Sequence, residues 1–210
     1  FRFLPTLAAV RMVSCEADLI DVCPTSWRVV PQELHAALTR TRAQAAVLVA
    51  PFGLKSDWSE HIEIAAKFGA RIVIDNAAGM GVERDNLEVS QHVAECYSLH
   101  ATKPFGIGEG GVIFAHASCE PNVRAALNFG LPHSGAEGGP SWGINGKLAK
   151  VAAAKLAGEV EDKAFYEAKL VSANYYAERF LPDAGALRRK LEAGSEYMMK
   201  LPAEAFATAA

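Results

Sequence analysis

The sequence lacks the features that mark membrane-spanning and nucleic-acid-binding proteins. No apolar run reaches the roughly 20 residues that a membrane span needs, and no signal-peptide pattern opens the chain. Positive charge is not in excess, since 21 Lys and Arg against 24 Asp and Glu give a formal net charge of -3. Nucleic acids and anionic membranes usually bind to a basic face, so we expect neither as a partner.

The sequence also gives little sign of metal sites or disulfides. The four cysteines show no C-x-x-C spacing, and the six histidines include no H-x-x-x-H pair. We therefore predict no metal site, and we interpret these residues as structural or superficial. So few cysteines in 210 residues are typical of a reduced, cytoplasmic protein. The remaining composition, 50% hydrophobic and 21% charged, is ordinary for a globular protein with a sizeable core.

Short apolar runs alternate with helical patterns over the first 115 residues. The runs predict strands at 18–22, 45–50, 71–75, 95–100 and 111–115. Helices are predicted from Pro31 to Thr39 and from Ser56 or Asp57 to Gly69. The run at 45–50 is almost wholly apolar, as in a strand buried on both faces. This alternation predicts an α/β fold with a mainly parallel sheet flanked by helices.

The second half of the chain changes character. A glycine-rich polar stretch at 130–139 predicts a surface loop, and 145–180 predicts one long helix or two. The chain starts at Phe1-Arg-Phe-Leu as though cut into a strand, and it stops soon after another strand-like stretch at 197–202. We therefore expect a fragment of a longer protein.

One lysine stands in a loop between two predicted strands, in Ser98-Leu-His-Ala-Thr-Lys-Pro-Phe-Gly-Ile-Gly-Glu-Gly-Gly. Parallel sheets bind ligands at the carboxyl ends of their strands, which is where Lys103 would lie. A lysine there can form an imine with an aldehyde once its ammonium has lost a proton, and partial burial favours that loss. The glycines could instead cradle a phosphate, but the lysine precedes them, unlike G-x-x-x-x-G-K-S/T. A tight turn with a surface lysine is an equal alternative.

Asp75 ends the strand at 71–75 and would lie at the same edge of the sheet. A carboxylate there can keep a pyridine nitrogen protonated, so that the ring accepts electrons from a substrate carbanion. The competing interpretation is an aspartate that caps the next turn. Without Lys103 beside it, the capping role would be preferred.

Two segments together resemble the DegT/DnrJ/EryC1/StrS family of aminotransferases. They are Val73-Ile-Asp-Asn-Ala-Ala-Gly-Met-Gly and the lysine loop with its Gly-Glu-Gly-Gly ending. The similarity runs from Ile20-Asp-Val to Trp142-Gly-Ile-Asn-Gly-Lys-Leu. It implies a fold-type-I, aspartate aminotransferase-like architecture. Residues 1–170 would be the cofactor-binding large domain without its N-terminal phosphate turn, and 171–210 the truncated start of a small domain.

The resemblance also implies a cofactor, pyridoxal 5'-phosphate, and a role for each of four residues. Lys103 would hold the cofactor as a Schiff base and move the substrate proton, and Asp75 would pair with the pyridine nitrogen. Ser98 would bind the cofactor phosphate. Asn145 would reach the phosphate in the neighbouring subunit, which requires a homodimer with shared active sites. Without the resemblance, Ser98 and Asn145 are ordinary polar loop or helix-cap residues.

The implied activity is transfer of an amino group from an amino acid such as glutamate to a nucleotide-linked keto sugar. Two alternatives stay open: another cofactor-dependent reaction such as a lyase or dehydratase, and a catalytically weak remnant that acts through association. Family dehydratases lack the lysine, so Lys103 argues against that branch. Ala78 stands where the family commonly has Gln or His, and Asn145-Gly-Lys replaces Asn-Tyr-Arg. Ala78 bears on substrate type and subfamily more than on cofactor binding.

Overall fold

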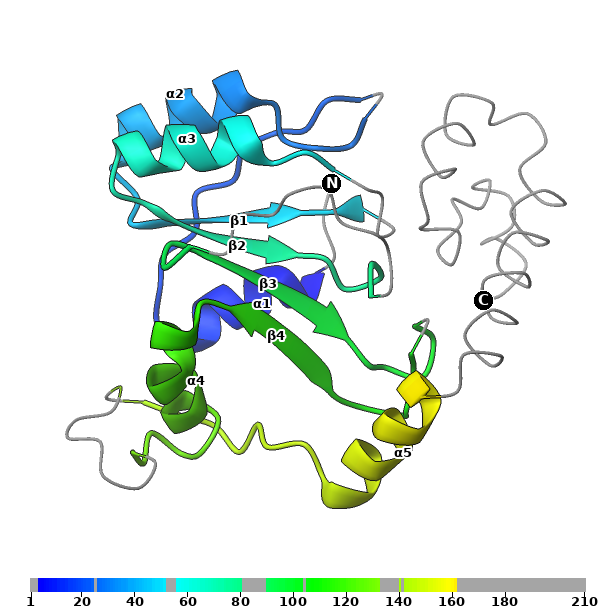
Figure 1. Ribbon diagram of the computed structural model, residues 1–210. Coiled ribbons are helices and arrows are strands. Elements are labelled where there is room, and N and C mark those ends of the chain that lie inside the picture. The colour runs from blue at the N-terminus through cyan, green and yellow to red at the C-terminus, as the bar shows by residue number, and fades with distance from the viewer. Residues whose placement is uncertain are drawn as a thin grey trace, which may run out of the picture.

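The computed structural model describes residues 4–24, 26–51, 56–80, 90–103, 105–132, 140 and 142–161. Four strands and five α-helices lie within these ranges (Figure 1). In chain order they are α1 (Leu4–Met12), α2 (Pro31–Thr41), β1 (Ala45–Val49), α3 (Ser59–Lys67), β2 (Arg71–Asp75), β3 (Val93–Ser98), β4 (Gly111–Ala115), α4 (Glu120–Ala126) and α5 (Lys150–Glu161).

The four strands form one sheet in the order β1-β2-β3-β4. The pairs β1–β2 and β2–β3 are parallel, and β4 runs antiparallel to β3, which confirms the predicted mainly parallel sheet. Asp75 stands opposite Cys96, and Ser98 stands opposite Gly111. The carboxyl ends of β2 and β3 and the start of β4 therefore meet at one edge of the sheet.

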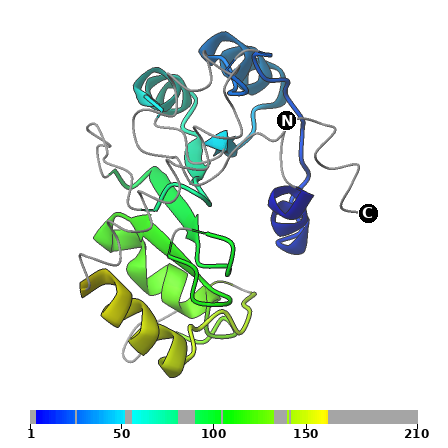
Figure 2. The same cartoon turned by 90° about the vertical axis from the view of Figure 1, so that its right-hand side faces the viewer.

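The hydrophobic core lies between this sheet and the pair α2 and α3. Its members include Leu34 and Leu38 of α2, Ile64 of α3, and Ile72 and Ile74 of β2. Successive side chains of a strand point to opposite faces, so Asp75 points to the face opposite Ile72 and Ile74. Figure 2 shows α1 standing to one side of the sheet, with α4 and α5 on the other.

Most ends of α2 and α3 follow their sequence signals. Pro31 occupies the first turn of α2, and Arg42 ends that helix in the left-handed conformation at φ 55°. The N-cap residue of α3 is Trp58, without a side-chain cap bond, and not the predicted Ser56 or Asp57. Asp57 still contacts the start of the helix, since its carboxylate accepts a 2.9 Å hydrogen bond from the backbone N–H of Ser59. Gly69, at φ +65°, follows α3 as predicted.

Three strand predictions need correction. Residues 18–22 form no strand, because a strand needs a hydrogen-bonded neighbour and none pairs with them among the described residues. The strand at 45–50 is not buried on both faces: β1 is the outermost of the described strands, and in it only Leu48 is fully buried. Leu4 begins α1 instead of ending a strand, and α1 was not predicted at all.

The other boundaries shift by a few residues. β3 begins at Val93 and ends at Ser98, two residues earlier than predicted at each end. The predicted helix at 145–180 begins only at Lys150, and α4 was not predicted. Residues 133–139 and 162–210 lie outside the described residues, as does the boundary at 170/171, so the loop, the rest of the helix and the second domain stay predictions. None of the described helices is long and apolar enough to cross a membrane.

Candidate active site

Residues 99–110, which join β3 to β4, form a loop held by its own backbone. Leu99 N–H donates to the Gly110 carbonyl at 3.0 Å, and Ala101 N–H donates to the Gly108 carbonyl at 2.8 Å. Lys103 N–H donates to the carbonyl of His100 at 2.8 Å. Leu99 is completely buried and anchors the start of the loop. The backbone at Lys103 is therefore fixed from within the loop.

Two glycines make this path possible. A Cβ at Gly106 would lie 2.6 Å from the His100 carbonyl oxygen, which is backbone and cannot yield as a side chain would. Gly108 has φ +117°, a conformation that L-residues rarely adopt. Close packing of the loop on itself therefore explains Gly106, and the backbone conformation explains Gly108.

The Lys103 side chain is partly shielded from solvent. Burial lowers its pKa below the ordinary lysine value, and the nearby Asp75 carboxylate opposes that shift by raising the pKa. Asp75 ends β2, and Lys103 lies in the loop that follows β3, the parallel neighbour of β2. The topology thus places at the same end of the sheet the two residues that the sequence singled out first.

The Asp75 carboxylate is held from two directions. Its Oδ2 accepts a 2.6 Å hydrogen bond from the hydroxyl of Thr6 in α1, and its Oδ1 accepts a 3.3 Å bond from the Ala77 N–H. The second contact has the turn-capping form that was the alternative interpretation of Asp75. Each oxygen of a carboxylate has two lone pairs, so both can accept a further hydrogen bond.

Ser98 ends β3 at the same edge. Its Oγ accepts a 3.1 Å hydrogen bond from the His100 N–H, and its own N–H donates to the Ala77 carbonyl at 3.1 Å. Because Oγ acts as an acceptor here, its hydroxyl hydrogen can be donated elsewhere. Ser98 therefore ties the end of β3 both to the lysine loop and to the turn after Asp75.

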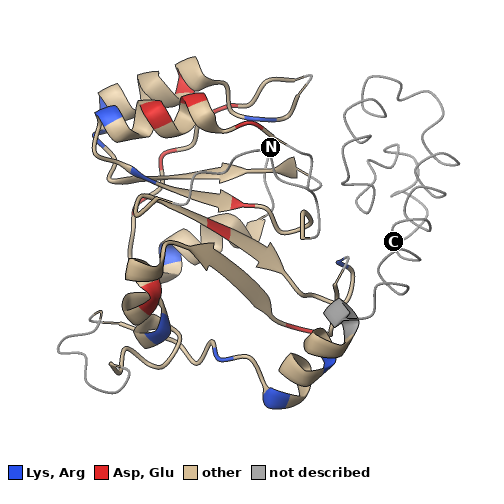
Figure 3. Cartoon of the chain, in the orientation of Figure 1, with Lys and Arg blue, Asp and Glu red and all other residues tan. Residues whose placement is uncertain are grey.

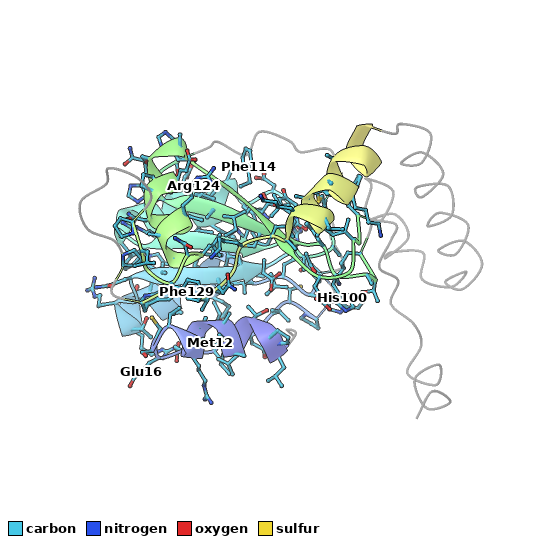
Figure 4. The ribbon with its side chains drawn as sticks, turned by 90° about the horizontal axis from the view of Figure 1, so that it is seen from below. Met12, Glu16, His100, Phe114, Arg124 and Phe129 are labelled. Atoms are coloured by element: carbon cyan, nitrogen blue, oxygen red, sulfur yellow. The ribbon has the colours of Figure 1, made fainter. Side chains whose placement is uncertain are left out.

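Asn145 belongs to a different part of the chain. It is exposed and pairs through its backbone with Asn128, just after α4. Figure 4 shows Phe129, the neighbour of Asn128, well apart from His100 of the lysine loop. The structure therefore unites Lys103, Asp75 and Ser98, whereas Asn145 makes its described contacts with the end of α4.

Sequence reasoning missed two residues beside Asp75. Cys96 is its register partner on β3, and burial, followed by the Asp75 charge, raises the pKa of its thiol. The pairing of β2 with β3 could have indicated Cys96. Thr6 carries no such signal, because it lies 69 residues from Asp75 and meets it only through the fold. Ala78, where the family commonly has Gln or His, is buried.

A cavity of about 300 Å³ lies next to this edge but not at it. It is formed by α1, residues 16–22, α2 and β1, and its lining is largely aliphatic. Thr6 lines this cavity, but Lys103, Asp75 and Ser98 do not. We therefore define the candidate site by the side chains at the strand ends and not by this cavity.

Charge is mixed over the molecule. Basic and acidic residues both occur on α2, α3 and α4 (Figure 3). Within the ranges that the structure describes, no group of three or more His, Cys, Asp and Glu side chains could hold a metal ion.

Comparison with known proteins gives a consistent result. The model of the DegT/DnrJ/EryC1/StrS aminotransferase family matches residues 1–198. Protein Rv3402c of Mycobacterium tuberculosis is 30% identical over 163 residues, which cover 73% of this chain and 38% of that protein. UDP-N-acetyl-3-dehydro-alpha-D-glucosamine 3-aminotransferase of Acidithiobacillus ferrooxidans is 28% identical over 204 residues, 89% of this chain and 52% of that enzyme.

Solved structures resemble the fold to the same degree. The crystal structure of DesI in the presence of its TDP-sugar product matches with a TM-score of 0.71 and 29% identity. The match covers 85% of this chain and 46% of DesI. The chain therefore spans about half the length, or less, of the proteins it matches.

Proposed function

Because the chain belongs to the DegT/DnrJ/EryC1/StrS aminotransferase family, whose members depend on pyridoxal 5'-phosphate, we propose that the protein is an aminotransferase with Lys103 as its catalytic lysine. The observation that carries the proposal is that Asp75 ends β2 and Lys103 follows β3, its parallel neighbour, so that both lie at the same end of the sheet. Either residue alone has an ordinary explanation. A partly buried amine and a carboxylate at the ends of adjoining strands are the groups that cofactor chemistry of this kind needs.

The residues at this edge fit the cofactor by their chemistry. Lys103 offers an amine whose pKa is lowered by burial, so it loses its proton more readily than a surface lysine. Asp75 offers an acceptor for a protonated ring nitrogen. Ser98 offers a hydroxyl hydrogen, since its Oγ already accepts from His100, and a phosphate oxygen can accept that hydrogen.

When bound, pyridoxal phosphate supplies an aldehyde that condenses with amines and a pyridine ring that accepts electrons. The protein's part is to hold and to move protons. Lys103 would hold the cofactor through Nζ, and its amine would be the group that carries the substrate proton. Asp75 would hold a proton on the ring nitrogen. Ser98 would hold the phosphate and so fix the orientation of the cofactor.

The substrates are an amino acid donor such as glutamate and a nucleotide-linked keto sugar. Support comes from the names of two similar proteins, one an aminotransferase of a UDP-linked 3-dehydro sugar and the other crystallised with its TDP-sugar product. The buried Ala78 leaves more room than the Gln or His of the family, and this favours a difference in substrate within the same reaction type.

The proposed active form is a homodimer in which Asn145 reaches the cofactor phosphate of the partner. Support comes from the exposure of Asn145 and of three large apolar side chains near it, Phe129, Trp142 and Ile144. Exposed apolar groups of this kind are common at protein interfaces. Sedimentation of the cofactor-loaded protein should give a dimer, and a monomer that transfers amino groups at full rate would overturn this part. The small number of cysteines, four in 210 residues, supports a cytoplasmic location, which cell fractionation can check.

Release of 2-oxoglutarate tests the proposed reaction. The loaded protein with glutamate alone should give one equivalent of 2-oxoglutarate per site, because the reaction cannot continue until an acceptor takes up the amino group. Sustained release should follow when UDP-N-acetyl-3-dehydro-glucosamine or a TDP-linked keto sugar is added. The same sugar without its nucleotide is the control. No initial release would refute the aminotransferase, and equal turnover with the free sugar would refute the nucleotide-linked substrate.

The lowered pKa of Lys103 predicts how cofactor capture depends on pH. Only the neutral amine attacks an aldehyde, so the capture rate should rise with pH and level off above the pKa of Lys103. The midpoint should lie below that of Nα-acetyl-lysine measured with the same cofactor, because burial is the main cause of the shift. In Asp75→Asn the midpoint should fall further, since the Asp75 charge raises the pKa. A midpoint equal to or above that of the free amine would contradict a shielded Lys103.

A further inference from the structure

A hydrogen bond of good geometry joins α1 to the candidate site. The Thr6 hydroxyl donates to Asp75 Oδ2 at 2.6 Å, a length typical of a charge-assisted O–H···O⁻ bond. No residue of α1 is fully buried, so this helix is not fixed by deep apolar packing among the described residues. The hydrogen bond from Thr6 therefore stands out from the shallow apolar contacts of the rest of α1.

The direction of α1 brings its first turn to the site. In Figure 4, Met12 and Glu16 mark the far end of the helix, and His100 of the lysine loop lies toward the other end. Thr6 is the third residue of α1 and lies in its first turn, on the face that meets the sheet. The strand alternation sends the Asp75 side chain to this same face, away from the α2–α3 core.

We propose that Thr6 is a positioning residue, which fixes the rotation of the Asp75 carboxylate and so determines how well that group holds a proton on the cofactor's ring nitrogen. This inference rests on the proposed function. A carboxylate at the end of a side chain turns easily about its last bond, since this torsion is broad. Thr6 holds one oxygen and the Ala77 N–H holds the other more weakly, at 3.3 Å, so the plane of the carboxylate is set chiefly by Thr6.

Removal of the hydroxyl tests the inference. Thr6→Val keeps the shape of the side chain and loses the donor, whereas Thr6→Ser keeps the donor. We expect kcat to fall about tenfold or more in Thr6→Val, as for loss of a hydrogen bond to a charged group, with KM for glutamate nearly unchanged. The visible absorbance of the bound cofactor should show a shifted pH midpoint. Thr6→Ser should retain the kcat and the pH midpoint of the unmutated protein. Thr39→Val is the control and should change neither, since Thr39 donates to the His35 carbonyl within α2.

A double-mutant cycle separates positioning from stability. If Thr6 acts through Asp75, Thr6→Val should have no further effect on the absorbance midpoint in an Asp75→Ala background. A purely structural role would lower the melting temperature without moving the midpoint, and it would overturn the proposal. If Thr6→Val does not fold, Thr6→Ala replaces it, and an unaltered absorbance midpoint in Thr6→Ala would likewise overturn the proposal. If the unmutated protein shows no cofactor absorbance band, the proposed function itself is refuted.

Discussion

Replacement of Lys103 by alanine should abolish amino transfer and the visible absorbance band of the bound cofactor together. The variant loses both the covalent attachment through Nζ and the group that moves the substrate proton. Proton transfer by a positioned side chain alone contributes about 10²–10⁴-fold, so kcat should fall by at least a thousandfold. The measurement is 2-oxoglutarate release from glutamate, with an absorbance spectrum of the same sample.

Lys67→Ala provides the matched control for that result. Lys67 is exposed at the end of α3, which leads into the start of β2 and so lies at the opposite edge of the sheet. Its removal should leave both the rate and the band unchanged. A Lys103→Ala variant that retains the band and turns over normally would show that another lysine carries the chemistry. Retained folding of both variants, checked by circular dichroism, excludes loss of structure as the cause.

Conversion of Asp75 to asparagine should lower kcat strongly while the protein still binds its cofactor. The amide cannot keep a proton on the ring nitrogen as a carboxylate does, so the ring loses its capacity to accept electrons. We expect a loss of about a hundredfold or more, the size found when a preorganised electrostatic group is removed from an active site. Rate measurements at saturating glutamate and spectra of the bound cofactor would establish it.

The control here is Asp18→Asn. Asp18 forms an exposed ion pair with Arg40 at 2.7 Å, and exposed pairs contribute little to stability. The Asp18 variant should therefore transfer amino groups at the normal rate. If Asp75→Asn also did so, with an unaltered spectrum, Asp75 would be only the cap of the turn that begins at Ala77.

The sequence was informative wherever the signal was local. Pro31 and Gly69 mark helix ends through backbone preferences that need no other part of the chain. Asp75 and Lys103 were placed at one edge because the carboxyl ends of parallel strands share an edge whatever the details of packing. These rules hold without knowledge of the tertiary contacts.

What the sequence could not supply depends on contacts between distant segments. The apolar run of β1 predicts a strand buried on both faces, yet β1 is the outermost of the described strands. The prediction fails because burial depends on neighbours that the residues of β1 do not specify. The helix α1 is weakly patterned, and its apolar residues could equally form a strand. The Thr6–Asp75 bond joins residues that no local pattern relates.

The position of the covalent attachment is the central claim, and reductive trapping tests it most directly. Borohydride reduction of the loaded protein fixes the cofactor to the amine that holds it, and peptide mass spectrometry then identifies that amine. We predict the phosphopyridoxyl label on Lys103 and on no other lysine. A label on a different lysine, or an unlabelled Lys103 in protein that shows the cofactor band, would contradict the account.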